Sequence, residues 1–227
     1  MADNVGPLCI TQVGSGWVDK GTHAQTKNQP SAPRGIYVCG TPAHSAAKAV
    51  MDTLSDAAVA KINFTIDGFA VSSAMYANAA RLVREGKVVV AYDASLSGCA
   101  YYDQNANRLE VNFTTASTLT KRALLIHEST HTVFDAKPYA KATVATSEAA
   151  AYIAQCIFAK VHATGPDERL YDDDDAKDLV FEKAWLVAGK IIAGQTPNAA
   201  DYAALKTAVA SSPDYPNASR LSGWNGI

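Results

Sequence analysis

The pattern His-Glu-x-x-His at residues 127–131 constrains this chain more than any other feature of its sequence. The run around it, residues 115–135, has no proline or glycine, and its apolar residues recur at helical spacing, which predicts a partly buried α-helix. Residues four apart lie on the same face of a helix, so His127 and His131 can present two imidazole nitrogens to one metal ion. Glu128 lies near that face, where it can serve as a general base without being a ligand.

A second run without proline, residues 142–163, follows a short break at residues 137–139 and carries one acidic residue, Glu148. An antiparallel helix pair joined by such a loop would bring Glu148 beside the two histidines as a third ligand. The fourth tetrahedral position would then take water or a substrate carbonyl. The alternative is a helix with two surface histidines and a solvated glutamate, since so short a pattern also arises by chance.

These residues resemble the zincin metallopeptidases, and among them the gluzincin type, whose third ligand is a glutamate on the next helix. The resemblance implies a Zn²⁺ ion held by His127, His131 and Glu148, with Glu128 as general base and proton shuttle. It also implies an enzyme that hydrolyses peptide bonds in a peptide or protein substrate. It covers the two helices and not the whole chain.

The chain departs from the family pattern beside the third ligand. Larger gluzincins often have an asparagine before that glutamate and an aspartate after it that orients the first histidine; here Ser147 and Tyr152 take these places. Tyr152 would lie within one helical turn of Glu148 and could hydrogen-bond a ligand histidine, or it could pack in the core. The metzincin pattern is absent, because residues 135–146 contain neither glycine nor histidine.

Two strands are predicted directly before the motif helix, at residues 98–103 and 108–113, around a polar turn. In gluzincin-like enzymes a sheet edge lies above the zinc and pairs with an extended substrate. The resemblance therefore implies that Ala100, Tyr101 and Tyr102 bind substrate by strand addition. The alternative is an ordinary hairpin in the core sheet.

A further donor is needed for the oxyanion that forms during peptide hydrolysis, and the resemblance favours a tyrosine. Tyr101, Tyr102 and Tyr171 are the candidates, and the sequence does not choose among them.

The expected fold is α+β, a mostly helical single domain with a small antiparallel sheet or hairpin before the active-site helix. The zincin-like domain would span residues 41–227, after an irregular N-terminal arm of residues 1–40. Further helices are predicted at about residues 42–61, 71–85, 179–194 and 198–209, and a buried strand at 87–92. In the tail from residue 211, Tyr215 and Trp224 are expected to cover the core.

Charge and hydropathy exclude several classes of partner. The 227 residues include 20 basic and 22 acidic side chains, for a net charge of −2, and no Lys/Arg stripe, which argues against nucleic acid. No stretch is long and apolar enough to span a bilayer, and the first residues lack the features of a secretory signal. A cytoplasmic protein, or one exported without such a signal, is expected, and its oligomeric state leaves no mark on the sequence.

Two rival functions stay open. The chain could be a delivered bacterial effector or interaction domain with a zincin fold, in which the metal is structural or absent. It could also be a helical interaction domain with an accidental motif, which predicts that Glu148 lies far from the histidines.

The four cysteines form no Cys-x-x-Cys pair, so buried free thiols are expected. In an exported protein, Cys9 and Cys39 could form a disulfide.

Overall fold

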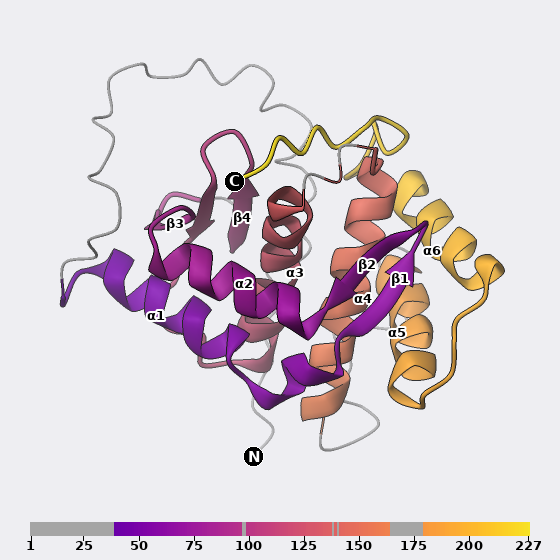
Figure 1. The fold of residues 1–227 in the computed structure, drawn as a ribbon, viewed down its shortest axis with the longest axis horizontal. Coiled ribbons are helices and arrows are strands. Elements are labelled where there is room, and N and C mark those ends of the chain that lie inside the picture. The colour runs from indigo at the N-terminus through magenta and orange to yellow at the C-terminus, as the bar shows by residue number, and fades with distance from the viewer. Residues whose placement is uncertain (1–38, 97–98, 138, 140, 164–178) are drawn as a thin grey trace.

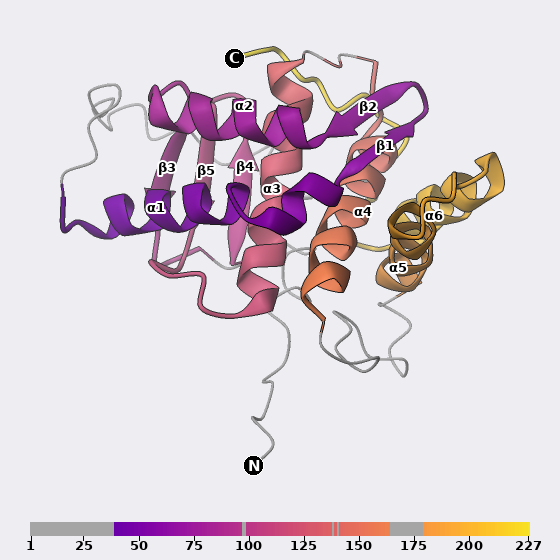
Figure 2. The same ribbon diagram turned by 60° about the horizontal axis from the view of Figure 1, so that its bottom comes forward.

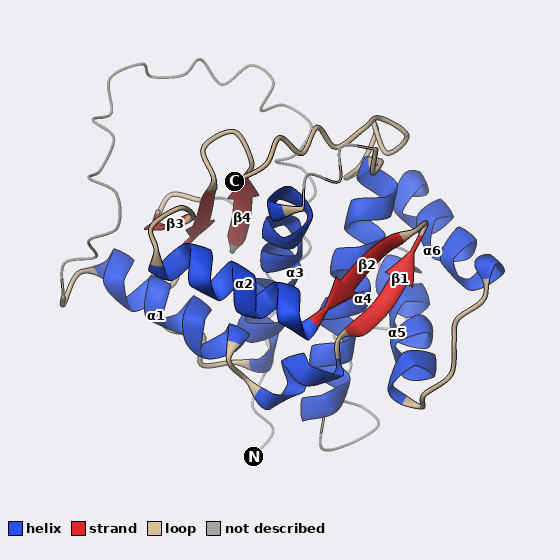
Figure 3. Cartoon of the chain, viewed as in Figure 1, coloured by secondary structure: helices blue, strands red, loops and turns tan. Residues whose placement is uncertain are grey.

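The structure is a computed structural model that describes residues 39–96, 99–137, 139, 141–163 and 179–227. Within these ranges the chain forms six α-helices, one short 3₁₀ helix and five short strands (Figures 1 and 3). This confirms the predicted α+β, mostly helical class. The predicted N-terminal arm lies outside the described residues, except for its last two.

The helices begin close to where the sequence predicts them. They are α1 (Pro42–Leu54), η3 (Ala57–Lys61), α2 (Ser73–Arg84), α3 (Leu119–Ala136), α4 (Val144–His162), α5 (Leu179–Ile192) and α6 (Ala199–Ser211). Side-chain caps fix the first turns of α1, α3, α4 and α6. The side chains of Thr118 and Thr143 accept hydrogen bonds from backbone N–H groups in the first turns of α3 and α4. Asn198 does the same for α6, within a complete capping box.

The strands form two small sheets. β1 (Asn63–Ile66) and β2 (Phe69–Ser72) make an antiparallel hairpin, while β3 (Val89–Tyr92), β4 (Ala100–Asp103) and β5 (Arg108–Val111) make a sheet with the order β3-β5-β4. The predicted hairpin is confirmed as the antiparallel pair β4–β5, but β3 runs parallel to β5, so this sheet is mixed. The helix predicted from residue 71 is wrong at its start, since Val71 and Ser72 belong to β2.

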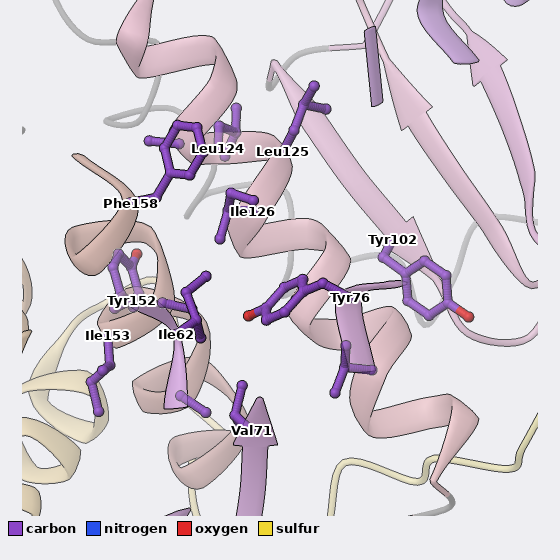
Figure 4. Close-up of a cluster of buried hydrophobic side chains, with 14 of the residues drawn as sticks. Ile62, Val71, Tyr76, Tyr102, Leu124, Leu125, Ile126, Tyr152, Ile153 and Phe158 are labelled. Carbon is purple, nitrogen blue, oxygen red and sulfur yellow. The ribbon is translucent and has the colours of Figure 1, made fainter. Parts of the chain in front are cut away.

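Helices α3 and α4 pack against each other at the centre of the molecule (Figure 2). α1, α2 and β4 contact α3, whereas α5 and α6 contact α4. Every residue of α3 from Ala123 to Asp135 is buried, and so is every residue of α4 from Ala145 to Ala159. Figure 4 shows the apolar part of this interior, with Ile126 of α3 and Ile153 and Phe158 of α4. Burying each such side chain contributes about 1.5–3 kcal/mol.

The C-terminal segment, residues 212–227, returns to the start of α4. The carbonyls of Arg220 and Ala218 accept hydrogen bonds from Val144 N–H and Ala145 N–H, each at 2.8 Å. These donors belong to the first turn of the helix, which has no intrahelical partners for them. Tyr215 and Trp224 of this segment are buried, as predicted.

The cysteines differ from expectation. Cys99 is disulfide-bonded, and its partner lies outside the described residues. Cys39 and Cys156 carry free thiols, so the Cys9–Cys39 pairing is wrong and the expectation of free thiols fails for Cys99. Among the described helices, none is both long enough and apolar enough to cross a membrane.

The turn between β1 and β2 ties the hairpin to two helices. Asp67 and Gly68 both have positive φ, at 49° and 84°, which suits a two-residue hairpin turn. The Asp67 carboxylate accepts hydrogen bonds from Thr146 Oγ1 of α4 at 2.8 Å and from Lys206 Nζ of α6 at 2.6 Å. Burial opposes ionisation, but the hydrogen bonds from Lys206 and Thr146 lower the pKa of Asp67 below its usual value.

Replacing Asp67 therefore tests how this turn stabilises the fold. Asp67→Ala should lower the free energy of unfolding by about 1–2 kcal/mol, because alanine is strained at positive φ and loses both partners. Asp67→Asn should cost less, about 0.5 kcal/mol, because it tolerates the turn and loses only a partly exposed ion pair. Because the folded-state pKa is lowered, the carboxylate's contribution is present above the unfolded-state pKa and is lost as pH falls through the folded-state value. Urea denaturation measures both variants, and equal losses would contradict the assignment.

Candidate metal centre

Three of the predicted site residues converge between α3 and α4. His127 Nε2 lies 3.3 Å from Glu148 Oε2, and His131 Nε2 lies 3.5 Å from Glu148 Oε1. The ligand atoms that the three side chains offer all lie within 4.8 Å of one another. The second rival function required Glu148 to lie far from the histidines, and it does not.

The spacing of these atoms fits a small divalent cation. Ligand atoms held about 2.1 Å from a tetrahedral zinc ion lie about 3.4 Å apart. The three side chains are at most 5% exposed, and Glu148 Oε2 is buried without a hydrogen-bond partner. Because a buried carboxylate needs a counter-charge or hydrogen bonds, this group could bind a metal ion. The arrangement does not by itself identify the metal.

The two histidines are held with Nε2 toward Glu148 by hydrogen bonds at the opposite ring nitrogen. His127 Nδ1 donates to Gln155 Oε1 at 3.0 Å, and His131 Nδ1 hydrogen-bonds with Ser147 Oγ at 3.2 Å. A proton on Nδ1 leaves the lone pair on Nε2, which is the atom that would bind the ion. Both supporting residues lie on α4, the helix that also carries Glu148.

Tyr152 contacts His127 through its ring rather than through its hydroxyl. The two rings pack edge to face, with centroids 4.7 Å apart. The hydroxyl of Tyr152 lies 3.0 Å from the hydroxyl of Tyr215 instead. The sequence suggested a hydrogen bond between Tyr152 and a histidine, but Gln155 makes that hydrogen bond, to His127. Ser147, the other residue singled out beside Glu148, hydrogen-bonds His131.

The pKa shifts of His131 and Glu148 favour the forms that bind metal ions, whereas burial opposes ionisation of His127 but the Glu148 and Glu128 carboxylates raise its pKa. Burial lowers the pKa of His131 to about 4, so this ring is neutral at neutral pH. Burial opposes ionisation of Glu148, but the neighbouring His131 and His127 hold its pKa below the usual value. A neutral imidazole and a charged carboxylate are the forms that bind metal ions.

Glu128 is fully buried next to this group and is anchored at one oxygen. Its Oε2 accepts a hydrogen bond from the backbone N–H of Tyr102 at 3.0 Å, while Oε1 has no hydrogen-bond partner. Burial, together with the nearby Glu148 carboxylate, raises the pKa of Glu128 to about 8. The strand β4 therefore fixes the orientation of this carboxylate.

The residues predicted to bind substrate lie on β4, at the edge of the three-stranded sheet. Ala100 and Tyr102 are buried, and Tyr101 is half-buried. The Tyr102 N–H is donated to Glu128 and its hydroxyl to Asp135 Oδ2 at 2.9 Å, so neither donor is directed to a substrate. Strand addition at Ala100 and Tyr101 stays a prediction. Tyr171, the third candidate oxyanion donor, lies outside the described residues.

A pocket of about 290 Å³ lies beside Glu148. Its walls come from β4, the start of α4 and the C-terminal segment, and include Tyr101, Ser147, Glu148, Tyr215, Arg220 and Trp224. Tyr215 lines this pocket together with Glu148, and its hydroxyl lies 3.0 Å from the hydroxyl of Tyr152. Tyr215, Gln155 and Trp224 were not assigned to the site from the sequence, because nothing in the motif marks them.

Comparison with protein-family models, with curated proteins and with solved structures gives no match for this chain.

Removing one histidine tests whether His127, His131 and Glu148, called the metal group below, bind a metal ion. His131→Ala should lower the bound metal per chain to a small fraction of the parent value, because two protein ligands hold a divalent ion far more weakly than three. Elemental analysis of protein purified without added metal measures this. His44→Ala, on α1 and outside the group, is the matched control and should keep the parent's metal content. Equal metal in His131→Ala and the parent would contradict the ligand assignment.

Proposed function

We propose that the protein is a zinc-dependent metallopeptidase of the gluzincin type. The observation that carries the proposal is the convergence of His127, His131 and Glu148 beside a buried Glu128 whose Oε1 has no partner. Within the described part of the chain, the group offers three protein ligands, which is the pattern of catalytic zinc sites; structural sites are closed by four. The neighbouring pocket gives a substrate access to Glu148.

Each residue has a role that its contacts support. Zinc, when bound, would polarise the scissile carbonyl and lower the pKa of the attacking water. Glu128 Oε1 would take the proton from that water and pass it to the leaving amine, while Oε2 stays anchored to the Tyr102 N–H. Gln155 and Ser147 would keep His127 and His131 in the tautomer that binds metal.

The position of Tyr215 supports a role as oxyanion donor, and Tyr101 lines the same pocket. Tyr215 lines the pocket with Glu148 and its hydroxyl lies beside another hydroxyl, that of Tyr152, whereas the hydroxyl of Tyr102 donates to the Asp135 carboxylate. The hydroxyl of Tyr152 lies 3.0 Å from the hydroxyl of Tyr215 and can hold it in place by a hydrogen bond. A donor fixed beside the reacting carbonyl stabilises the charge that develops there.

The role of Glu128 as base is tested by removing its charge. Glu128→Gln should lower the rate of peptide hydrolysis by roughly a thousand-fold or more, while the bound zinc per chain stays at the parent level. The assay digests a proteome-derived peptide mixture and reads the products by mass spectrometry, alongside elemental analysis. Glu85→Gln, an exposed change at the far end of α2, is the control. A Glu128→Gln protein as active as the parent would refute the assignment, and a metal-loaded parent that cleaves nothing would favour an interaction domain with a structural metal.

The role of Tyr215 is tested by removing its hydroxyl alone. Tyr215→Phe should reduce kcat by about 100-fold, as expected for one oxyanion donor, with little change in zinc content. Tyr92→Phe, which alters an exposed tyrosine at the end of β3, should cleave at the parent rate. Parent-like kcat in Tyr215→Phe would exclude it as the donor.

A further inference from the structure

Asp135 is a buried carboxylate that the proposed reaction does not use. It lies one helical turn beyond His131 on α3 and is 0% exposed, yet it is not part of the metal group. His127, His131 and Asp135 are spaced by four residues, so all three lie along one side of the helix. A buried carboxylate costs stability unless it is fully hydrogen-bonded, so its partners indicate its purpose.

Both oxygens of Asp135 bind donors from outside α3. Oδ1 accepts the backbone N–H groups of Asn225 and Gly226, at 3.0 and 2.9 Å. Oδ2 accepts the hydroxyl of Tyr102 at 2.9 Å. One side chain thus joins the C-terminal segment to the edge strand β4, and both elements line the pocket.

Each of these two elements also contacts one residue of the candidate site, Glu128 or His131. On the β4 side, Tyr102 donates its backbone N–H to Glu128. On the other side, Trp224, the residue before Asn225, stacks on the ring of His131, with centroids 5.6 Å apart and an interplanar angle of 23°. Trp224 is 8% exposed and also contacts the rings of Phe134 and Tyr102, so its position is well defined.

We propose that Asp135 is a positioning residue for both His131 and Glu128. By holding β4 and the C-terminal segment in place through its hydrogen bonds, it sets the orientation of these two side chains. Its hydrogen bonds to Asn225 and Gly226 seat Trp224 on His131, and its hydrogen bond from Tyr102 steadies the strand that holds Glu128. The roles given to His131 and Glu128 rest on the proposed function. The contacts of Asp135 do not involve the metal ligands directly, so its effect is transmitted through Trp224 and Tyr102.

The two sets of contacts predict different defects. Tyr102→Phe removes the hydroxyl but keeps the backbone N–H, so it should slow hydrolysis by several-fold while zinc affinity stays at the parent value, because Glu128 is not a ligand. Trp224→Ala should weaken zinc binding by about tenfold, the lower end of the range for residues that orient ligand histidines. Asp135→Asn keeps one acceptor oxygen and should show both defects in milder form. Asp52→Asn, at the exposed surface of α1, is the matched acidic control.

The experiment makes two measurements on the full chain. The first is zinc affinity, by competition with a chromophoric chelator, and the second is the quenching of tryptophan fluorescence by added Co²⁺. Trp224→Phe should lose most of the Co²⁺ quenching, and Asp135→Asn should change its amplitude, since Trp224 would no longer be held against His131. Circular dichroism confirms that each variant folds; if Asp135→Asn does not, Tyr102→Phe and Trp224→Phe carry the test.

Parent-like zinc affinity and Co²⁺ quenching in a folded Asp135→Asn protein would overturn the proposal. Parent-like zinc affinity in Trp224→Ala would overturn it as well. Neither readout depends on catalysis. If the parent binds zinc but cleaves no peptide, the proposed function fails while the positioning by Asp135 is still tested.

Discussion

The structure depends on one contact between two helices, the approach of the Glu148 carboxylate to the rings of His127 and His131. It lies in the part of α3 and α4 that is buried without interruption, where polar side chains would ordinarily be excluded. Burying a carboxylate against two imidazoles is unfavourable unless a proton or a metal ion lies between them. The interior of this protein is therefore built around a buried polar group that could bind a metal ion, and its apolar core surrounds that group.

The composition of α4 makes the approach possible. Much of the helix consists of alanine, including Ala149, Ala150 and Ala154, all fully buried. Small side chains allow another helix to pack closely, so that the longer side chains of Glu148 and Gln155 can reach residues on α3. Bulky apolar residues are placed farther along, at Ile157 and Phe158, where they fill the core instead. The same helix thus supplies the carboxylate of the candidate metal site, two hydrogen-bond partners for the histidines and a share of the apolar interior.

Local sequence patterns predicted the elements that carry the metal group but not the details of their contacts. The histidine spacing, the runs without proline and the short break placed α3 and α4 correctly, and an antiparallel pair was enough to bring Glu148 to the histidines. Which residue of α4 would support His127 depended on the rotation of α4 about its axis. Tyr152 and Gln155 are three residues apart on one face, and the structure selects Gln155.

Other features were missed for different reasons. The β1–β2 hairpin could have been found, because Asp67-Gly68 between alternating apolar residues is a strong hairpin pattern. The parallel pairing of β3 with β5 could not, because it joins strands that are separated by β4 in the sequence. The positions of Tyr215 and Trp224 follow from hydrogen bonds made by an irregular tail, which has no periodicity to read.

The metal group and the neighbouring pocket are therefore organised in different ways. The metal group and its supports, Gln155 and Ser147, all belong to α3 and α4, so their geometry is set by a single helix pair. The pocket needs β4 and the C-terminal segment as well, which come from distant parts of the chain and meet at Asp135. Metal binding should therefore tolerate changes in β4 and the C-terminal segment better than substrate recognition does. The C-terminal segment contacts the ring of His131 through one stacked ring, that of Trp224, whereas these two elements form most of the surface that a substrate would touch.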